Sequence, residues 1–237
     1  MGKSKDLATL KDSGLSIDGT LTTTSTGTNL TSNSYNVVKI QTDKDDNGSN
    51  DDAILQFTNG SSNTVKGELR YDESESMFEI GHGDNQGHIR VDSSGRVLKP
   101  NTPAFRAYGL GNTASAGGTA NSGEYLLVGS NGVPVNNGSH YNASNGTFTV
   151  PVAGLYYFAF SLLYDNSYSN NGSASLRKNG SDLYEYAYVE GDQSADYIQA
   201  SASGVVSCAA NDAIRLYSYL AGWHTASESS FTGFLIG

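Results

Sequence analysis

Apolar and polar residues alternate along this chain in short blocks that have the length of β-strands. The clearest pair meets at a corner: Thr147 to Val152 is β-branched and aromatic, and Leu155 to Leu163 is almost wholly apolar. Pro151 and Gly154 lie between the two runs, where a strand ladder would break. The second run is too short to cross a bilayer, which needs about 20 apolar residues. It therefore predicts a central strand that is covered on both faces.

Side chains of this central strand alternate between two faces. Tyr156 and Phe158 fall on one face, and Leu155 and Tyr157 fall on the other. We expect a second sheet to cover one face and a neighbouring subunit to cover the other. Tyr156 and Phe158 are our candidates for contacts between subunits.

Residues 35–100 show a different pattern, in which short apolar runs recur about every ten residues between turns rich in Gly, Asn, Asp and Ser. The predicted strands are 35–40, 53–58, 65–71, 77–80, 88–91 and 96–98. Each apolar face is only a few side chains wide, so one copy could not bury it usefully. We expect three chains to wind these strands into a thin, β-prism-like trimeric shaft.

Residues 101–237 predict a self-contained β-sandwich at the tip. Of the apolar side chains, 26 lie in residues 1–100 and 61 lie in residues 101–237, so only the second part can bury a core of its own. No sustained 3.6-residue apolar period occurs there, and tight turns are marked by five Asn-Gly pairs. These pairs begin at residues 131, 137, 145, 171 and 179. The expected organisation is 1–34 as an N-terminal segment, 35–100 as the shaft and 101–237 as the tip.

Charge and cysteine content exclude several classes of function. The net charge is −10, with 10 basic and 15 acidic residues before position 101 and 4 basic and 9 acidic residues after it. Neither part offers a basic patch for nucleic acid. Cys208 is the only cysteine, so no intramolecular disulfide can form. We see no secretory signal and no membrane-inserting segment, and we expect assembly in the cytoplasm.

Several spaced motifs follow a fixed order from about Pro103 to Gly237. They are Tyr141-Asn142, Gly146-x-Phe148, Val150-Pro151-Val152-x-Gly154-Leu155-Tyr156-Tyr157-Phe158, Lys178-Asn179-Gly180 and Phe231-x-Gly233-Phe234-Leu235-Ile236. This order resembles the globular head of complement component 1, subcomponent q, which shares its jelly-roll fold with tumour necrosis factor. The resemblance implies an all-β, ten-stranded sandwich that forms a tight trimer and binds ligands through its outer loops. Two departures are Asn211-Asp212 in place of the usual Gly-Asp, and the lack of a preceding collagen-like repeat.

Two further stretches resemble bacteriophage fibres. Gly67-Glu68-Leu69-Arg70-Tyr71-Asp72, Phe78-x-Ile80-Gly81 and the run from Ile89 to Phe105 look like the junction between the shaft and the tip of phage tail fibres. The opening, Gly2-Lys3-Ser4 through Asp18-Gly19-Thr20-Leu21, resembles the start of some marine phage fibre proteins. This second resemblance implies that residues 1–34 attach to other tail proteins of the virion. The alternative is a disordered N-terminus.

Tyrosine is the most informative residue type in the tip. Thirteen of the fifteen tyrosines and the only tryptophan lie beyond residue 100, many among small polar residues, a composition typical of binding surfaces and suited to sugars. In expected loops, the candidates for contact with a host glycan or protein receptor are Tyr164, Tyr168, Trp223 and His224. A second group occupies one face of an expected strand and either binds ligand or, as we expect, lines the trimer interface: Tyr184, Tyr186 and Tyr188.

Three patterns raise metal binding or catalysis as alternatives. Alternating oxygen ligands of the kind that begin a calcium loop are Asp43, Asp45, Asn47 and Asp51, but Ile54 stands where the bidentate Glu belongs, so a solvated acidic turn is the other interpretation. A glycine-rich loop holds His82, Asp84 and His88, which could ligate a transition metal or form an ordinary turn. Carboxylates that could serve a glycosidase are Asp182, Glu185, Glu190, Asp192 and Asp196. We assign no catalytic residue, no metal and no cofactor, with calcium left open.

The sequence as a whole predicts a non-enzymatic virion protein. The expected function is a homotrimeric phage tail fibre whose tip binds a host surface receptor, such as the glycan of lipopolysaccharide. The alternatives are a capsid head fibre or decoration protein, and a soluble bacterial lectin-like trimer.

Overall fold

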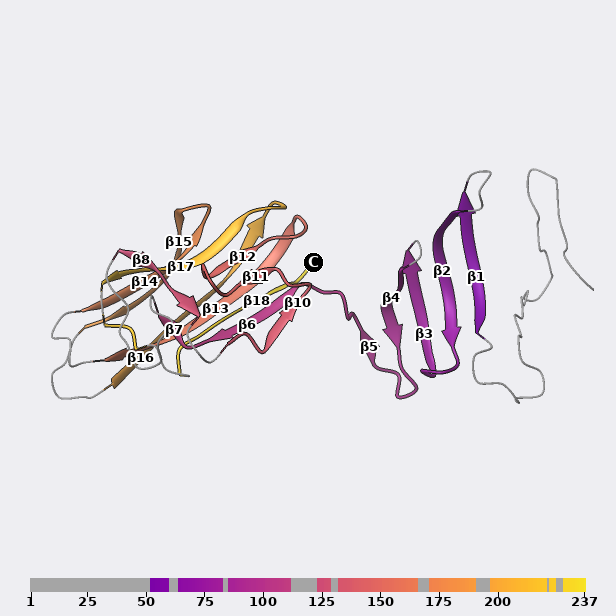
Figure 1. The fold of residues 1–237 in the computed structure, drawn as a ribbon, viewed down its shortest axis with the longest axis horizontal. Coiled ribbons are helices and arrows are strands. Elements are labelled where there is room, and N and C mark those ends of the chain that lie inside the picture. Colours follow the sequence, from indigo (N-terminus) through magenta and orange to yellow (C-terminus); the bar gives the residue numbers. More distant parts are fainter. Residues whose placement is uncertain are drawn as a thin grey trace, which may run out of the picture. The chain divides into compact units, whose positions relative to one another are not determined.

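The computed structural model describes residues 52–59, 64–82, 85–111, 123–128, 132–165, 171–190, 197–220, 222–224 and 228–237. Within these ranges the chain forms strands and turns only, as the sequence predicts (Figure 1). The described ranges accordingly contain no helix with the length and apolar character that a membrane crossing requires.

Five consecutive strands form the first sheet, which we call the β1–β5 sheet (Figure 1). Its strands pair as antiparallel neighbours in chain order: β1 (Ala53–Asn59), β2 (Thr64–Asp72), β3 (Met77–His82), β4 (Asn85–Val91) and β5 (Val97–Leu98). They confirm the strands expected between residues 53 and 98. The strand expected at 35–40 lies outside the described residues.

One face of the β1–β5 sheet is apolar across all five strands. Strand register aligns Leu55, Leu69, Ile80 and Ile89 in one row. The next row on the same face consists of Ala53, Tyr71, Phe78, Val91 and Val97. Most of the large side chains in these two rows are exposed in the single chain. Exposed apolar patches of this extent mark contact surfaces, so we expect another surface to pack on this face.

The opposite face of the β1–β5 sheet is held together by ion pairs. One cross-strand row runs from Ile54 through Arg70, Glu79 and Arg90 to Leu98. Arg90 pairs with Glu79 at 2.8 Å, and Arg70 pairs with Asp72 at 3.1 Å and with Asp52. Opposite charges on facing strands stabilise a sheet, so these ion pairs support the pairing of β2, β3 and β4 within one chain.

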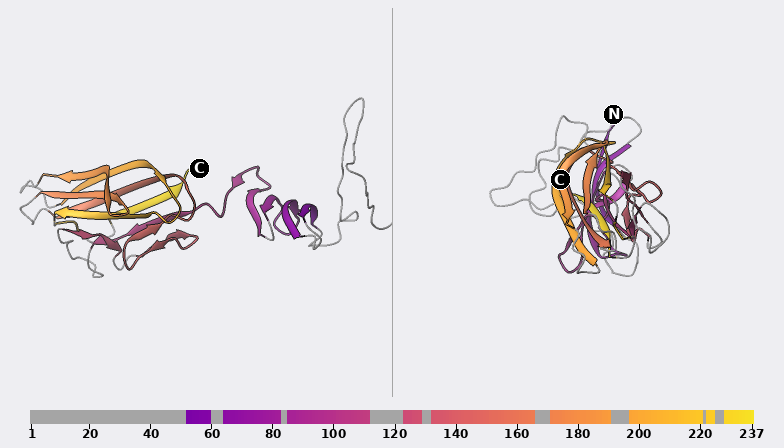
Figure 2. Two further views of the ribbon diagram at one scale, coloured as in Figure 1. Left: turned by 90° about the horizontal axis from the view of Figure 1, so that it is seen from above. Right: turned by 90° about the vertical axis from the view of Figure 1, so that its left-hand side faces the viewer.

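The remaining strands build a two-layered sandwich (Figures 1 and 2). One layer, the β6 sheet, has the order β10 (Val135–Asn137), β6 (Ala104–Tyr108), β18 (Ser230–Leu235), β13 (Gly154–Asp165) and β16 (Tyr197–Cys208). The other, the β17 sheet, has the order β11 (Tyr141–Asn142), β12 (Thr147–Thr149), β17 (Ala213–Leu220), β14 (Gly172–Lys178) and β15 (Ser181–Val189), with β8 (Glu124–Tyr125) also paired to β17. A separate pair consists of β7 (Leu110–Gly111) and β9 (Leu127–Val128).

The strand count differs from the ten that the resemblance implies. The described residues place five strands in the β6 sheet and six in the β17 sheet. Pairing partners change between Leu98 at the end of β5 and Ala104 at the start of β6. The domain boundaries expected at residues 34 and 100 stay predictions.

An aromatic cluster joins the two layers of the sandwich. Phe105 of the β6 sheet stacks on Phe148 of the β17 sheet with 4.8 Å between ring centroids, and on Tyr141 at 4.6 Å. Phe158 and Phe231 close the cluster from β13 and β18. All five rings are buried, and aromatic burial of this extent dominates the stability of such a core.

The central strand β13 runs through the middle of this core, and it corrects one prediction. Tyr156 and Phe158 have no exposed surface and point between the two sheets, so they cannot contact a neighbouring subunit. Phe158 fits because its register partners are glycines: Gly233 on β18 and Gly204 on β16. A Cβ on Gly233 would lie 2.4 Å from Phe158 Cδ1, which no packed structure tolerates.

The Asn-Gly pairs mark turns at most of the predicted places. The glycines at positions 132, 138, 146 and 180 adopt positive φ, as glycine does readily because it lacks a Cβ. Gly172 instead begins β14, where a Cβ would collide with the ring of Tyr164 at 2.6 Å. That glycine is required by close packing rather than by a turn.

Candidate functional site

The outward face of the β17 sheet carries alternating tyrosines and arginines, and we call it the tyrosine–arginine face. Along β17, Arg215, Tyr217 and Tyr219 point outward while the residues between them are buried. The neighbouring strands extend this face with Arg177 and Tyr125, because Arg215 faces Arg177 and Tyr217 faces Tyr125 in the strand register.

These side chains stack on one another. The guanidinium carbon of Arg177 lies 3.4 Å from the ring centroid of Tyr217, and that of Arg215 lies 3.4 Å from the centroid of Tyr125. The rings of Tyr125 and Tyr217 meet edge to face at 5.2 Å, and Tyr217 meets Tyr219 in the same way at 5.0 Å. Guanidinium groups favour such positions because of the negative face of the ring. The face is therefore fixed before any ligand binds.

Asp182 anchors the β15 side of this face. Its carboxylate accepts hydrogen bonds from Arg177 Nε at 2.6 Å, from Ser175 Oγ at 2.9 Å and from the hydroxyl of Tyr219. The hydrogen bond from Arg177 is the main reason that the pKa of Asp182 falls to about 2. A general acid for glycoside cleavage needs the opposite shift. Asp182 is therefore suited to hold Arg177 in place and unsuited to donate a proton.

The anchor predicts a pH-dependent contribution to stability. We expect Asp182→Asn to lower the free energy of unfolding at pH 7 by about 1 kcal/mol, a modest value because the carboxylate is 32% exposed. Since the folded-state pKa lies below the ordinary value, the contribution is complete above about pH 4 and disappears as the pH falls towards 2. Denaturant titrations of both proteins across this range test it, with Glu190→Gln as an exposed-carboxylate control. A difference that stays constant down to pH 2 would contradict the assignment.

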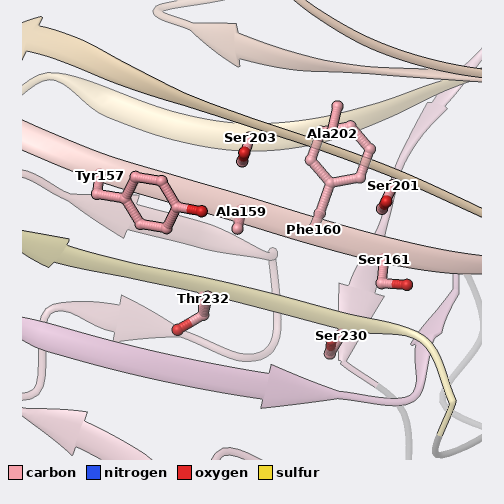
Figure 3. A pocket seen from close by; sticks show the side chains of 9 residues that line it. All are labelled: Tyr157, Ala159, Phe160, Ser161, Ser201, Ala202, Ser203, Ser230 and Thr232. Carbon is pink, nitrogen blue, oxygen red and sulfur yellow. The ribbon is translucent and has the colours of Figure 1, made fainter.

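A second notable surface is the outward face of the β6 sheet, which we call the hollow face. One end of it carries large side chains, namely Leu155, Tyr157, Val205, Phe234 and Ile236, all at least partly exposed. Next to them lies a stretch of mostly small side chains, and the sheet is hollowed there over about 640 Å³ (Figure 3). The labelled side chains of Ser161, Ser201, Ser203, Ser230 and Thr232 mark this region. A protruding partner surface could therefore approach the sheet closely.

Two of the four predicted receptor-binding residues belong to the core. Tyr164 ends up in β13 and not in a loop, and it pairs with Trp223 through an isolated bridge. Their rings meet edge to face at 5.7 Å and have 0% exposed surface, so neither can touch a receptor. His224 remains partly exposed against the ring of Tyr197, at 5.4 Å. Tyr168 lies outside the described residues.

The tyrosines of β15 lie at the edge of the sandwich. Tyr186 and Tyr188 are 48% and 59% exposed, and their strand borders an open groove of about 430 Å³ whose other wall is β16. Tyr184 belongs to the same strand. An edge position agrees with either a subunit contact or a ligand contact, so their assignment to a trimer interface stays a prediction.

The candidate metal positions fall mostly beyond the described part of the chain. Asp43, Asp45, Asn47, Asp51 and Asp84 lie outside it. His82 ends β3 and His88 belongs to β4. No group of three or more His, Cys, Asp or Glu residues in the described ranges could hold a metal ion.

Sequence reasoning missed Arg177 and Arg215 as members of a surface. A signal was present for one strand, because Arg215, Tyr217 and Tyr219 alternate and therefore share a face. Nothing in the sequence aligned Arg177 with Arg215, since this depends on the pairing of β14 with β17.

Two layers with the strand orders given above define an all-β jelly roll of the type shared by C1q and tumour necrosis factor. Residues 114–236 match the model of the C1q domain, and the chain belongs to this family. Domains of this kind are typically non-enzymatic binding modules and are often trimeric.

Solved structures with a similar fold include three from animals. The globular domain of a zebrafish complement 1qA protein is 18% identical, with a TM-score of 0.43, over 57% of this chain and 98% of that chain. Eiger TNF from S. frugiperda is 10% identical, with a TM-score of 0.43, over 58% and 94%. Murine APRIL is 13% identical, with a TM-score of 0.42, over 56% and 98%.

Proposed function

We propose that this chain is a homotrimeric, non-enzymatic tail-fibre protein of a bacteriophage whose C1q-type head binds a receptor on the host surface. The observation that carries this proposal is the β1–β5 sheet, whose rows of apolar side chains are exposed in one chain. Covering a half-exposed side chain of this size contributes on the order of 1 kcal/mol, so rows of them favour association strongly. Copies of the same chain offer an identical face, and a symmetric assembly satisfies all of them at once.

The two-layered sandwich of β6 to β18, which we call the head, supports the same association. Its hollow face places Tyr157, Phe234 and Val205 in one cross-strand row, next to a depression lined by small residues. A subunit interface needs apolar side chains and close packing between the partners. This face offers both, since apolar side chains lie beside a depression that a partner could fill. We assign the interface of the head to this face, in place of Tyr156 and Phe158.

The viral setting of the proposal rests on the resemblance of residues 67–105 and of the opening residues to phage fibres. Residues 1–34 would attach the fibre to other tail proteins, the β1–β5 sheets of three chains would form the shaft, and three heads would present repeated receptor sites. Repetition raises the avidity of contacts that are individually weak.

The oligomeric state is the first test. Sedimentation of the full chain at micromolar concentration is expected to give three copies of 25.0 kDa each, or about 75 kDa. A compact monomer under these conditions would refute the proposal.

The place on the particle is the second test. Labelled antibody against the head is expected to bind at tail tips of the phage. Labelling confined to the capsid would instead identify a head fibre or decoration protein, and a chain that never accompanies particles would identify a soluble lectin-like trimer.

A further inference from the structure

Two arginines stand directly opposite each other on the tyrosine–arginine face. Arg177 of β14 and Arg215 of β17 are register partners, and both point outward. Like charges in directly opposed positions destabilise an antiparallel pair. The head has only four basic residues against nine acidic ones, so a generally basic surface does not explain the pair. Asp182 and the tyrosine rings offset part of this repulsion, and an anionic ligand would offset more of it.

The two arginines differ in how their charge is balanced. Arg177 has Asp182 as its counter-ion, and β15, which carries Asp182, lies on the side of β14 away from β17. Arg215 donates one hydrogen bond, from Nη2 to the backbone oxygen of Asn145 at 2.6 Å, and has no acidic partner among the described residues. Its Nε is buried without a hydrogen-bond partner. Arg215 therefore carries an uncompensated charge.

Arg215 is surrounded by the planar rings of tyrosines. Its guanidinium rests on the ring of Tyr125, and the row that follows across the sheet contains Tyr217 and Tyr186. Tyr186 is half exposed and stacks on Tyr219 at 6.2 Å. Strands lie about 4.8 Å apart and residues rise about 3.4 Å along a strand, so Arg215 on β17 and Tyr186 on β15, two strands across and one row along, are separated by about 12 Å, the span of about two sugar rings.

We propose that the tyrosine–arginine face binds an anionic saccharide, with the acidic group paired to Arg215 and a sugar ring lying against the exposed tyrosines. Guanidinium groups pair in a forked geometry with carboxylate and phosphate oxygens, which neutral sugars lack. The flat tyrosine rings supply contact area at little entropic cost. The inference rests on the proposed function, in that a host surface glycan is the receptor, and it names both the site and the class of that glycan.

Calorimetric titration of the full chain with matched sugars tests the inference. One pair is oligogalacturonate and its methyl ester, in which neutral ester groups replace the carboxylates; the other is mannose 6-phosphate and mannose. We expect one acidic member to bind at least tenfold more tightly than its neutral counterpart, and the binding to weaken with added salt. These two pairs also separate a carboxylate ligand from a phosphate ligand.

Variants locate the site. Arg215→Gln is expected to weaken binding of the acidic sugar at least tenfold, and Arg215→Lys to restore it only in part, because lysine lacks the planar fork. Lys178→Gln is the matched control: it removes the same charge from β14, but its ammonium group contacts Ser207 on the other sheet. Its affinity should equal that of the unmodified chain.

Several results would overturn the inference. These are equal binding of acidic and neutral sugars, unchanged binding by Arg215→Gln, equal losses in Lys178→Gln, and failure of every acidic probe to bind. The sedimentation and particle-labelling tests do not involve Arg215. The proposed function and this site can therefore fail separately.

Discussion

Phe158→Ala is expected to lower the free energy of unfolding of the head by about 3–5 kcal/mol. Phe158 has no exposed surface and lies within about 6 Å of the rings of Tyr156, Phe148 and Phe231. Its register partners are glycines, so no neighbouring side chain of the sheet can move into the space that alanine would leave. The loss should therefore lie at the upper end for a buried aromatic residue.

Denaturant unfolding at a fixed protein concentration measures this loss, because association makes the apparent stability concentration-dependent. Phe234→Ala is the matched control: it removes the same side chain from the hollow face, where Phe234 is 43% exposed. We expect that control to weaken the association of subunits more than the fold of the head. Equal unfolding losses for the two variants would contradict the assignment of Phe158 to the core and Phe234 to the interface.

Ile80→Asp is expected to open the β1–β5 sheet of the assembled protein. Ile80 lies between Leu69 and Ile89 in the apolar row. If copies of the chain cover this face, the substitution buries an unpaired carboxylate in each of them, at several kcal/mol per site. The population of the open form should then rise by at least about 100-fold, since 1.4 kcal/mol corresponds to a factor of ten.

Limited proteolysis of residues 52–98 in the full chain measures that population when opening and closing are fast. Ser94→Asp adds the same charge in an exposed turn and is the control. An unchanged cleavage rate for Ile80→Asp would mean that the apolar face is exposed to water in the assembled protein. That result would contradict the proposed trimeric shaft.

Much of the fold follows from the sequence because its patterns are local. The short strands between residues 53 and 98, the corner at Pro151 and the glycines of four Asn-Gly turns all depend on neighbouring residues. The two faces of β13 were also predicted, but the assignment of Tyr156 and Phe158 to the subunit interface was wrong, because their face enters the core. Aromatic rings occupy both faces, and the decision lies in distant partners: Gly233 leaves room for Phe158, whereas Phe234 stands beside Tyr157.

The candidate site was less accessible to sequence reasoning. Tyr164 and Trp223 have polar neighbours in sequence, which suggested exposed loops, yet they pair with each other in the core. Arg177 of β14 and Arg215 of β17 lie far apart in the sequence. Strand pairing alone brings them together.

The two-sided character of the β1–β5 sheet restricts how the length of this segment can vary. Register assigns Leu69 to one side of the sheet and its neighbour Arg70 to the other. Deleting one residue within β2 would therefore move the side chains that follow the deletion to the opposite face. Removing or duplicating a complete hairpin leaves the alternation between the two faces intact in every remaining strand. Natural or engineered length variants should therefore change by whole hairpins, with odd-numbered insertions confined to the turns.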